Sequence, residues 1–190
     1  MVRSIVLMVL VAFSASAGAQ ALSYNYIQGS YGRVDLDGSS FNADGEGLGI
    51  SGSIAINEDF HITGEYQTAD MDFGVDLTII EVTLGYHTTI SENLDLVAQI
   101  GYLDFDVDAA GVGSADDNAL LIGVGVRAAV AHNVELSGGI DYIDFDRGDG
   151  EMRANAGFVM GLTDELAVGF KAAFWDDVNI YQFNLRYYFE

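Results

Sequence analysis

The feature that most constrains this chain is a period-two alternation of apolar and non-apolar residues along most of its length. At residues 47–56, Leu48, Ile50, Ile54 and Ile56 share one face, and glycine, serine and alanine form most of the other. Successive side chains of a strand point to opposite faces, so the pattern predicts β-strands. Ten such segments follow one another, at residues 22–34, 47–56, 60–67, 80–87, 94–102, 120–128, 134–142, 153–162, 166–174 and 181–189.

Two kinds of connection alternate between these segments. Five are long and rich in Asp and Gly, at residues 35–45, 70–76, 107–117, 146–151 and 175–178. Four are tight turns of similar sequence, at residues 57–59, 91–93, 131–133 and 163–165. A barrel that crosses a membrane has short turns at one end and longer loops at the other. An even number of strands places both termini at the short-turn end.

Charged residues within the strands avoid the apolar face completely. A soluble β-sandwich also alternates, but its non-apolar face is usually rich in Lys, Glu and Thr, whereas here glycine, serine and alanine prevail. A charge facing lipid costs about 2–4 kcal/mol at the membrane midplane, which explains the exclusion. We therefore expect the nine strand charges to face the lumen and to form an ion-pair network there: Glu65, Glu81, Asp95, Arg127, Glu135, Asp141, Arg153, Lys171 and Arg186.

Aromatic residues recur at two depths of the apolar face, as in the aromatic girdles of membrane barrels. Tyr102, Tyr142 and Phe174 lie towards the long connections, and Phe60 and Tyr86 lie towards the tight turns. The sequence therefore predicts an all-β fold: a ten-stranded antiparallel transmembrane β-barrel with short periplasmic turns and longer acidic outer loops.

The first 21 residues have the pattern of a secretory signal peptide. A basic start at Arg3 precedes an apolar run at residues 5–13, which is too short to span a bilayer as a helix. Small residues follow, and cleavage after Ala19 or Ala21 fits the usual Ala-x-Ala rule. We expect residues 1–21 to be removed and residues 22–190 to form the barrel domain.

Composition excludes several classes of function. Seven Lys and Arg residues against 29 Asp and Glu residues give a net charge of −22, so a nucleic acid partner is not expected. The absence of Cys excludes disulfides and thiolate metal sites. The three His residues are scattered, with no Ser and acid placed to form a catalytic set, so we expect neither an enzyme nor a cofactor. The Arg147-Gly148-Asp149 tripeptide occurs in some adhesins, but three residues often match by chance.

Carboxylates crowd the long connections, often as Asp-x-Asp pairs. Asp35, Asp37, Ser39 and Glu46 even match EF-hand offsets 1, 3, 5 and 12, but Ser40 stands where that loop needs Gly. We expect solvated anionic loops that bind divalent cations loosely, rather than one ordered metal site.

The two ends of the predicted barrel domain resemble a known family. The Tyr24-x-Tyr26 and Gly29-Ser30-Tyr31 opening and the closing strand are similar to those of small Gram-negative outer-membrane β-barrel proteins, the OmpA/OmpX-like group. The resemblance implies the cell outer membrane as location, lipid and lipopolysaccharide as surroundings, and periplasmic chaperones and the barrel-assembly machinery as partners in biogenesis. It also implies that this machinery reads the closing residues Phe183, Leu185, Tyr187 and Phe189, although here Glu190 follows the last aromatic residue.

Three functions remain open at this point. We expect a structural or cell-surface interaction role, with the narrow lumen filled by charged and small side chains. A small pore for ions or small solutes is the first alternative, because lumen charges can also line a conduction path. A barrel enzyme is the second alternative.

Overall fold

The computed structural model describes residues 22–37, 42–109, 111, 113–176 and 178–190. The predicted signal peptide lies outside these residues, as do Ser39 and Ser40. No helix within the described residues is long and apolar enough to cross a membrane. Ten strands and one short 3₁₀ turn make up the fold: β1 (Tyr26–Asp37), β2 (Asn42–Ala55), β3 (Phe60–Met71), η1 (Asp72–Gly74), β4 (Val75–Ser91), β5 (Leu94–Ala109), β6 (Gly113–Ala131), β7 (Val134–Phe145), β8 (Glu151–Gly161), β9 (Leu166–Trp175) and β10 (Val178–Tyr188).

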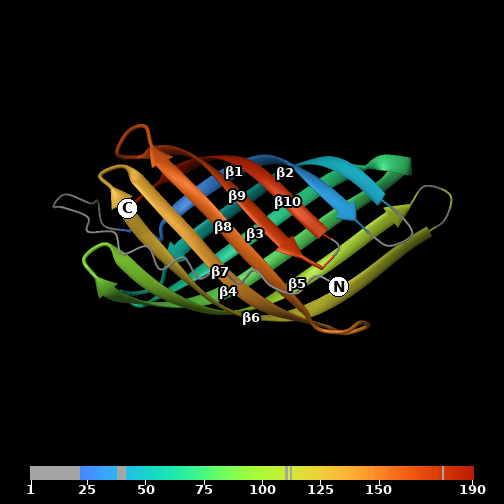
Figure 1. Cartoon of the computed structure of the whole chain (residues 1–190), viewed down its shortest axis with the longest axis horizontal. Coiled ribbons are helices and arrows are strands. Elements are labelled where there is room, and N and C mark those ends of the chain that lie inside the picture. Colours follow the sequence, from blue (N-terminus) through green and yellow to red (C-terminus); the bar gives the residue numbers. More distant parts are fainter. Residues whose placement is uncertain (1–21, 38–41, 110, 112, 177) are drawn as a thin grey trace.

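The ten strands close into one antiparallel barrel, as the sequence predicts. Each strand pairs with its neighbours in the chain, and β1 pairs with β10 from Tyr26 opposite Tyr188 to Leu36 opposite Val178. The strands run obliquely to the long axis of the barrel (Figure 1). We call the end with the tight turns and the C-terminus the turn end, and the opposite end the loop end.

The two faces of the sheet divide as the alternation predicts. Large apolar side chains cover the outside, where Leu48, Ile122 and Phe183 remain more than 60% exposed. The aromatic residues of both predicted girdles are also exposed there, including Tyr102 and Tyr142 towards the loop end. Such an apolar outer surface is stable in contact with lipid and not in contact with water.

β4, β5 and β6 extend further towards the loop end than the sequence predicts. β4, β5 and β6 have 17, 16 and 19 residues, against 11, 10 and 11 in β8, β9 and β10. The connection expected at residues 70–76 shrinks to the three residues of η1, and most of 107–117 is strand. The reason is that Asp residues in these segments alternate with apolar or small ones, so pairing continues beyond the lipid-facing residues.

Candidate functional site in the barrel lumen

Buried ion pairs join neighbouring strands inside the barrel. Near the turn end, the Arg127 guanidinium on β6 donates from Nε and Nη2 to the two carboxylate oxygens of Glu135 on β7, at 2.7 and 2.9 Å. Both side chains are about nine-tenths buried, at 12% and 13% exposure. A bidentate pair of this kind is the strongest geometry available to Arg and carboxylate.

A second group of charges lies around Arg153 on β8. Its guanidinium binds Glu81 on β4 at 2.8 Å and Asp141 on β7 at 3.0 Å, so it connects walls that are far apart in sequence. Asp141 is 1% exposed and also accepts hydrogen bonds from Gln99 and Asn155. Each oxygen of this deeply buried carboxylate therefore has a donor, as a buried charge requires.

Lys171 and Glu65 form a third pair across the lumen. The Lys171 ammonium on β9 lies 3.0 Å from a carboxylate oxygen of Glu65 on β3. Three strand-borne cations are thus matched to four strand-borne carboxylates, which holds opposite walls of the barrel together.

Asp95 and Arg186 depart from the expected network of opposite charges. Asp95 accepts hydrogen bonds from the hydroxyls of Tyr24 and Thr89, both at 2.9 Å, and no ion pair joins it to a cation in the described part of the chain. Arg186 donates to the Gln28 side-chain oxygen, and its guanidinium lies 3.9 Å from the centre of the Tyr26 ring. Hydroxyl donors satisfy the carboxylate and an aromatic ring face balances the guanidinium, so neither group needs an oppositely charged partner.

These polar groups surround one cavity in the lumen. It has a volume of about 220 Å³, and its walls carry Glu65, Glu81, Arg153 and Lys171 as well as Arg127 and Arg186. We call this space the polar chamber. Polar walls of this kind hold water rather than remaining empty.

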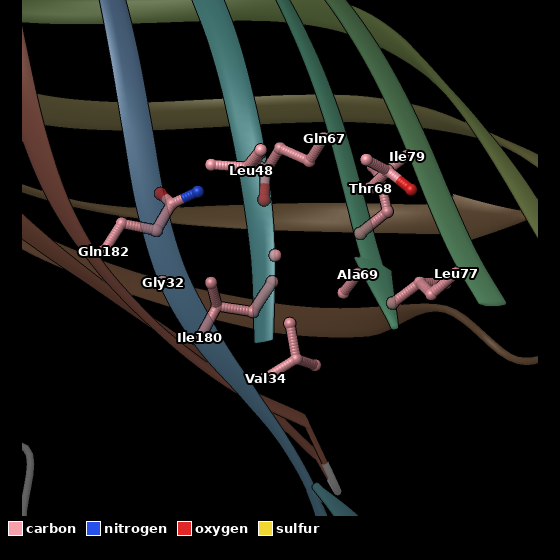
Figure 2. Close-up of a pocket in the computed structure, with 11 residues that line it drawn as sticks. Gly32, Val34, Leu48, Gln67, Thr68, Ala69, Leu77, Ile79, Ile180 and Gln182 are labelled. Atoms are coloured by element: carbon pink, nitrogen blue, oxygen red, sulfur yellow. The ribbon is translucent and has the colours of Figure 1, made fainter. Parts of the chain in front are cut away.

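The loop end of the lumen is filled by apolar side chains, which we call the loop-end apolar cluster. Leu103, Leu121 and Ile143 are at most 1% exposed, and Phe105 packs against both parts of the cluster. Figure 2 shows the side of this region formed by β1 to β4 and β10, with a small space of about 20 Å³ where the cluster meets Gln67 and Gln182. The buried members come from every strand except β8: Val34, Ala43, Ala69, Met71, Ile79, Leu103, Ala119, Leu121, Ile143, Ala173, Trp175 and Ile180.

The sequence analysis missed this cluster, although a signal for it exists. Its members stand next to outward-facing apolar residues, as in Ile79-Ile80 and Leu120-Leu121-Ile122. A run that is apolar on both faces is typical of a strand buried on both sides, and here it marks where the lumen is dry.

The turn end of the lumen also contains a residue that the sequence analysis did not assign to it. Tyr24 precedes β1 and is 6% exposed. Its ring stacks on the His87 ring, with the two centroids 3.8 Å apart, and its centroid lies 4.4 Å from that of the His61 ring. His61 and His87 therefore lie in an aromatic cluster with Tyr24, and their Nδ1 atoms are 3.3 Å apart.

The carboxylates at the loop end form cross-strand rows on the outside of the sheet. In the strand register, Glu46 lies opposite Asp70, Asp70 opposite Asp76, Asp76 opposite Asp108, and Asp106 opposite Asp116. All six side chains are exposed. We call this set of residues the carboxylate ladder: Glu46, Asp70, Asp76, Asp106, Asp108 and Asp116.

The EF-hand-like residues do not converge in the described part of the chain. Asp35 pairs with Arg33, and Glu46 accepts a hydrogen bond from the Tyr31 hydroxyl. In the Arg147-Gly148-Asp149 tripeptide, Arg147 donates to the Asp116 carbonyl at 2.7 Å. No group of three His, Asp or Glu side chains is placed to hold a metal ion among the described residues.

Comparison with known proteins identifies the family. The model of the outer membrane protein beta-barrel domain matches residues 5–189. The chain belongs to this family. Membership in the outer membrane protein beta-barrel family places the chain in the outer membrane. Comparison with curated protein sequences found no significant match.

Several solved outer-membrane protein structures are similar to this family member. Neisserial surface protein A (NspA) is 20% identical, with 88% of this chain and 98% of that one aligned and a TM-score of 0.45. An outer membrane channel from Pseudomonas putida F1 is 8% identical, with 89% and 97% aligned and a TM-score of 0.53. The KdgM porin, in complex with disordered oligogalacturonate, is 8% identical, with 87% and 99% aligned and a TM-score of 0.46. The likeness to the Pseudomonas putida channel, at 8% identity, concerns the fold alone.

Proposed function

We propose that this barrel is a non-conducting outer-membrane protein with a structural or cell-surface interaction role. The observation that carries the proposal is the loop-end apolar cluster, which nine of the ten strands contribute to. A hydrophobic constriction in a narrow lumen excludes water and therefore ions. The ion pairs of Arg127 and Arg153 also connect strands of the barrel wall to one another.

A narrow pore is the competing function, and the polar chamber is the observation that favours it. Conductance measurement in planar lipid bilayers separates the two. We expect no stepwise conductance from the purified, refolded wild-type protein. Regular unit steps from the wild type would overturn the proposal and favour the pore.

The surface available for interaction is the loop end, with its carboxylate ladder. Outer-membrane barrels of this class place their longer extracellular connections outside and their short turns in the periplasm. In that orientation the ladder lies beside the phosphates of lipopolysaccharide. We propose that divalent cations bridge these phosphates to the ladder, since Ca²⁺ and Mg²⁺ prefer oxygen ligands. The proposed export by a signal peptide and assembly through the closing strand are consistent with this orientation.

A further inference from the structure

The segment before β1 crosses the mouth of the barrel at the turn end. Residues 22–25 are not part of a strand. Tyr24 points into the lumen and donates its hydroxyl to Asp95 on β5 at 2.9 Å. The Arg127 guanidinium lies 4.2 Å from the centre of the Tyr24 ring and also donates to the Ser23 carbonyl at 2.9 Å. We call residues 22–25 the N-terminal plug.

The last residue of the plug ties it to two further strands. The Asn25 side-chain oxygen accepts the backbone N–H of Ala55, at the end of β2, at 2.8 Å. The Asn25 carbonyl accepts the backbone N–H of Phe189, just after β10, at 3.2 Å. Together with His61 on β3 and His87 on β4, these contacts attach the plug to strands around the mouth.

The plug stands between the polar chamber and the space beyond the turn end. Tyr24 lines the chamber, and Leu22 and Ser23 line a separate cavity of about 570 Å³ at the turn-end mouth. The loop-end apolar cluster closes the other side of the chamber. A route into the chamber that leaves the barrel wall intact therefore leads past Tyr24.

The plug can leave without opening the barrel. Its residues lie outside the strand ladder, so displacing them breaks the hydrogen bonds named above and the ring contacts of Tyr24 with His61, His87 and Arg127, and leaves all ten strand pairings in place. Local opening of this kind needs far less free energy than global unfolding.

We propose that the N-terminal plug is a displaceable lid, and that its release opens the polar chamber to small hydrophilic solutes from the periplasm but not from the cell surface. The direction of access rests on the orientation given under the proposed function. The proposal that the plug is a lid does not rest on that orientation, because it concerns the turn end whichever side of the membrane that end faces.

Cysteine accessibility tests the lid directly, because the chain contains no Cys. Ser137 on β7 lines the chamber, so Ser137→Cys provides a single thiol there. The rate of its reaction with a small charged methanethiosulfonate reagent would be measured on refolded protein in detergent. We expect Tyr24→Ala to raise the rate about tenfold or more, because opening equilibria set such rates. Tyr24→Phe, which keeps the ring and loses the bond to Asp95, should have a smaller effect.

A matched control is Tyr86→Ala, which removes a lipid-facing tyrosine near the same end. It should leave the labelling rate unchanged. If Tyr24→Ala does not fold, Asn25→Ala releases the plug through the bond to Ala55 and keeps every strand residue. An unchanged labelling rate in the folded plug variants would overturn the lid.

Labelling of Ser137→Cys in whole cells tests the direction of access. In the Tyr24→Ala background, a membrane-impermeant reagent should react after the periplasm is opened to it and not on intact cells. Equal reaction on intact cells would overturn periplasmic access. The labelling rate in detergent would still decide whether the plug acts as a lid. Labelling of Gly148→Cys on intact cells would show separately whether the orientation is wrong.

Discussion

At the scale of single residues, the lumen depends on a few buried charges with complete sets of partners. Arg153 is the clearest case, because it satisfies Glu81 and Asp141 together and lies 5.6 Å from the centre of the Trp175 ring. It therefore stands at the boundary between the polar chamber and the loop-end apolar cluster.

Replacing Arg153 with Leu would leave two buried carboxylates without their cation. We expect a loss on the order of 3 kcal/mol in the free energy of unfolding, because an uncompensated buried charge is costly. Equilibrium urea unfolding followed by Trp175 fluorescence measures it. Arg147→Leu is the control, since Arg147 and Asp116 are more than 60% exposed, and it should cost less than about 1 kcal/mol. Equal losses in the two variants would contradict the buried network.

Gly123 is a second sensitive position, because a Cβ atom there would collide with the Asp141 carboxylate. Gly123→Ala should therefore push Asp141 away from Arg153 and lower the free energy of unfolding by about 1–3 kcal/mol, the usual cost of overpacking. Gly64→Ala is the control, since a Cβ atom there meets nothing within 4 Å. The same urea titration compares the two. A Gly123 variant as stable as the Gly64 variant would show that Asp141 is not tightly held.

At the scale of strands, the outer rows of carboxylates raise the question of how like charges can lie opposite each other. Directly opposed like charges destabilise an antiparallel pair. Asp76 lies opposite both Asp70 and Asp108. Bound divalent cations would remove this repulsion.

We therefore expect weak, multi-site Ca²⁺ or Mg²⁺ binding of about millimolar affinity, the class of extracellular modules. Isothermal titration calorimetry on the refolded barrel measures it. The double variant Asp76→Asn with Asp108→Asn should bind less, whereas Glu92→Gln at the turn end should bind like the wild type. A flat trace at several millimolar Ca²⁺ would refute the prediction. A tight one-to-one isotherm would contradict loose, multi-site binding.

The strands also show how far the sequence can predict this fold. Alternation identified all ten strands and their lipid-facing sides, because that pattern depends on each strand alone. It misses the extent of β4 to β6, because their Asp-rich segments have the composition of loops, and because Phe105 and Val107 alternate with Asp residues in the opposite phase to the lipid-facing residues of β5. It also missed Tyr24, whose burial depends on His61, His87 and Arg127 meeting at one point after the barrel closes.

At the scale of the whole molecule, the two ends of the barrel differ in chemistry. The loop end carries exposed carboxylates outside and an apolar filling inside. The turn end carries the polar chamber, the N-terminal plug and both ends of the described chain. A single orientation in the membrane therefore exposes two different surfaces to the two compartments.

Orientation can be tested by labelling single cysteines on intact cells. We expect Gly148→Cys, in the connection between β7 and β8 at the loop end, to react with an impermeant thiol reagent, and we expect the same of Gly38→Cys, which lies outside the described residues. Glu92→Cys, in the tight turn between β4 and β5, should not react until the outer membrane is permeabilised. Labelling of the Glu92 position alone on intact cells would reverse the assignment of the two ends.

The pairing of β1 with β10 has a consequence for how the barrel is made. Tyr26 lies opposite Tyr188, so the contact that closes the ring joins residues from the two extremes of the described chain. Such a contact has the largest loop-closure entropy in the fold and forms slowly. Until β10 is in place, β1 and β9 each present an open row of backbone donors and acceptors, which invites pairing with other chains. Pairing of the eleven-residue β10 with both β1 and β9 is therefore the step that ends the period of aggregation risk.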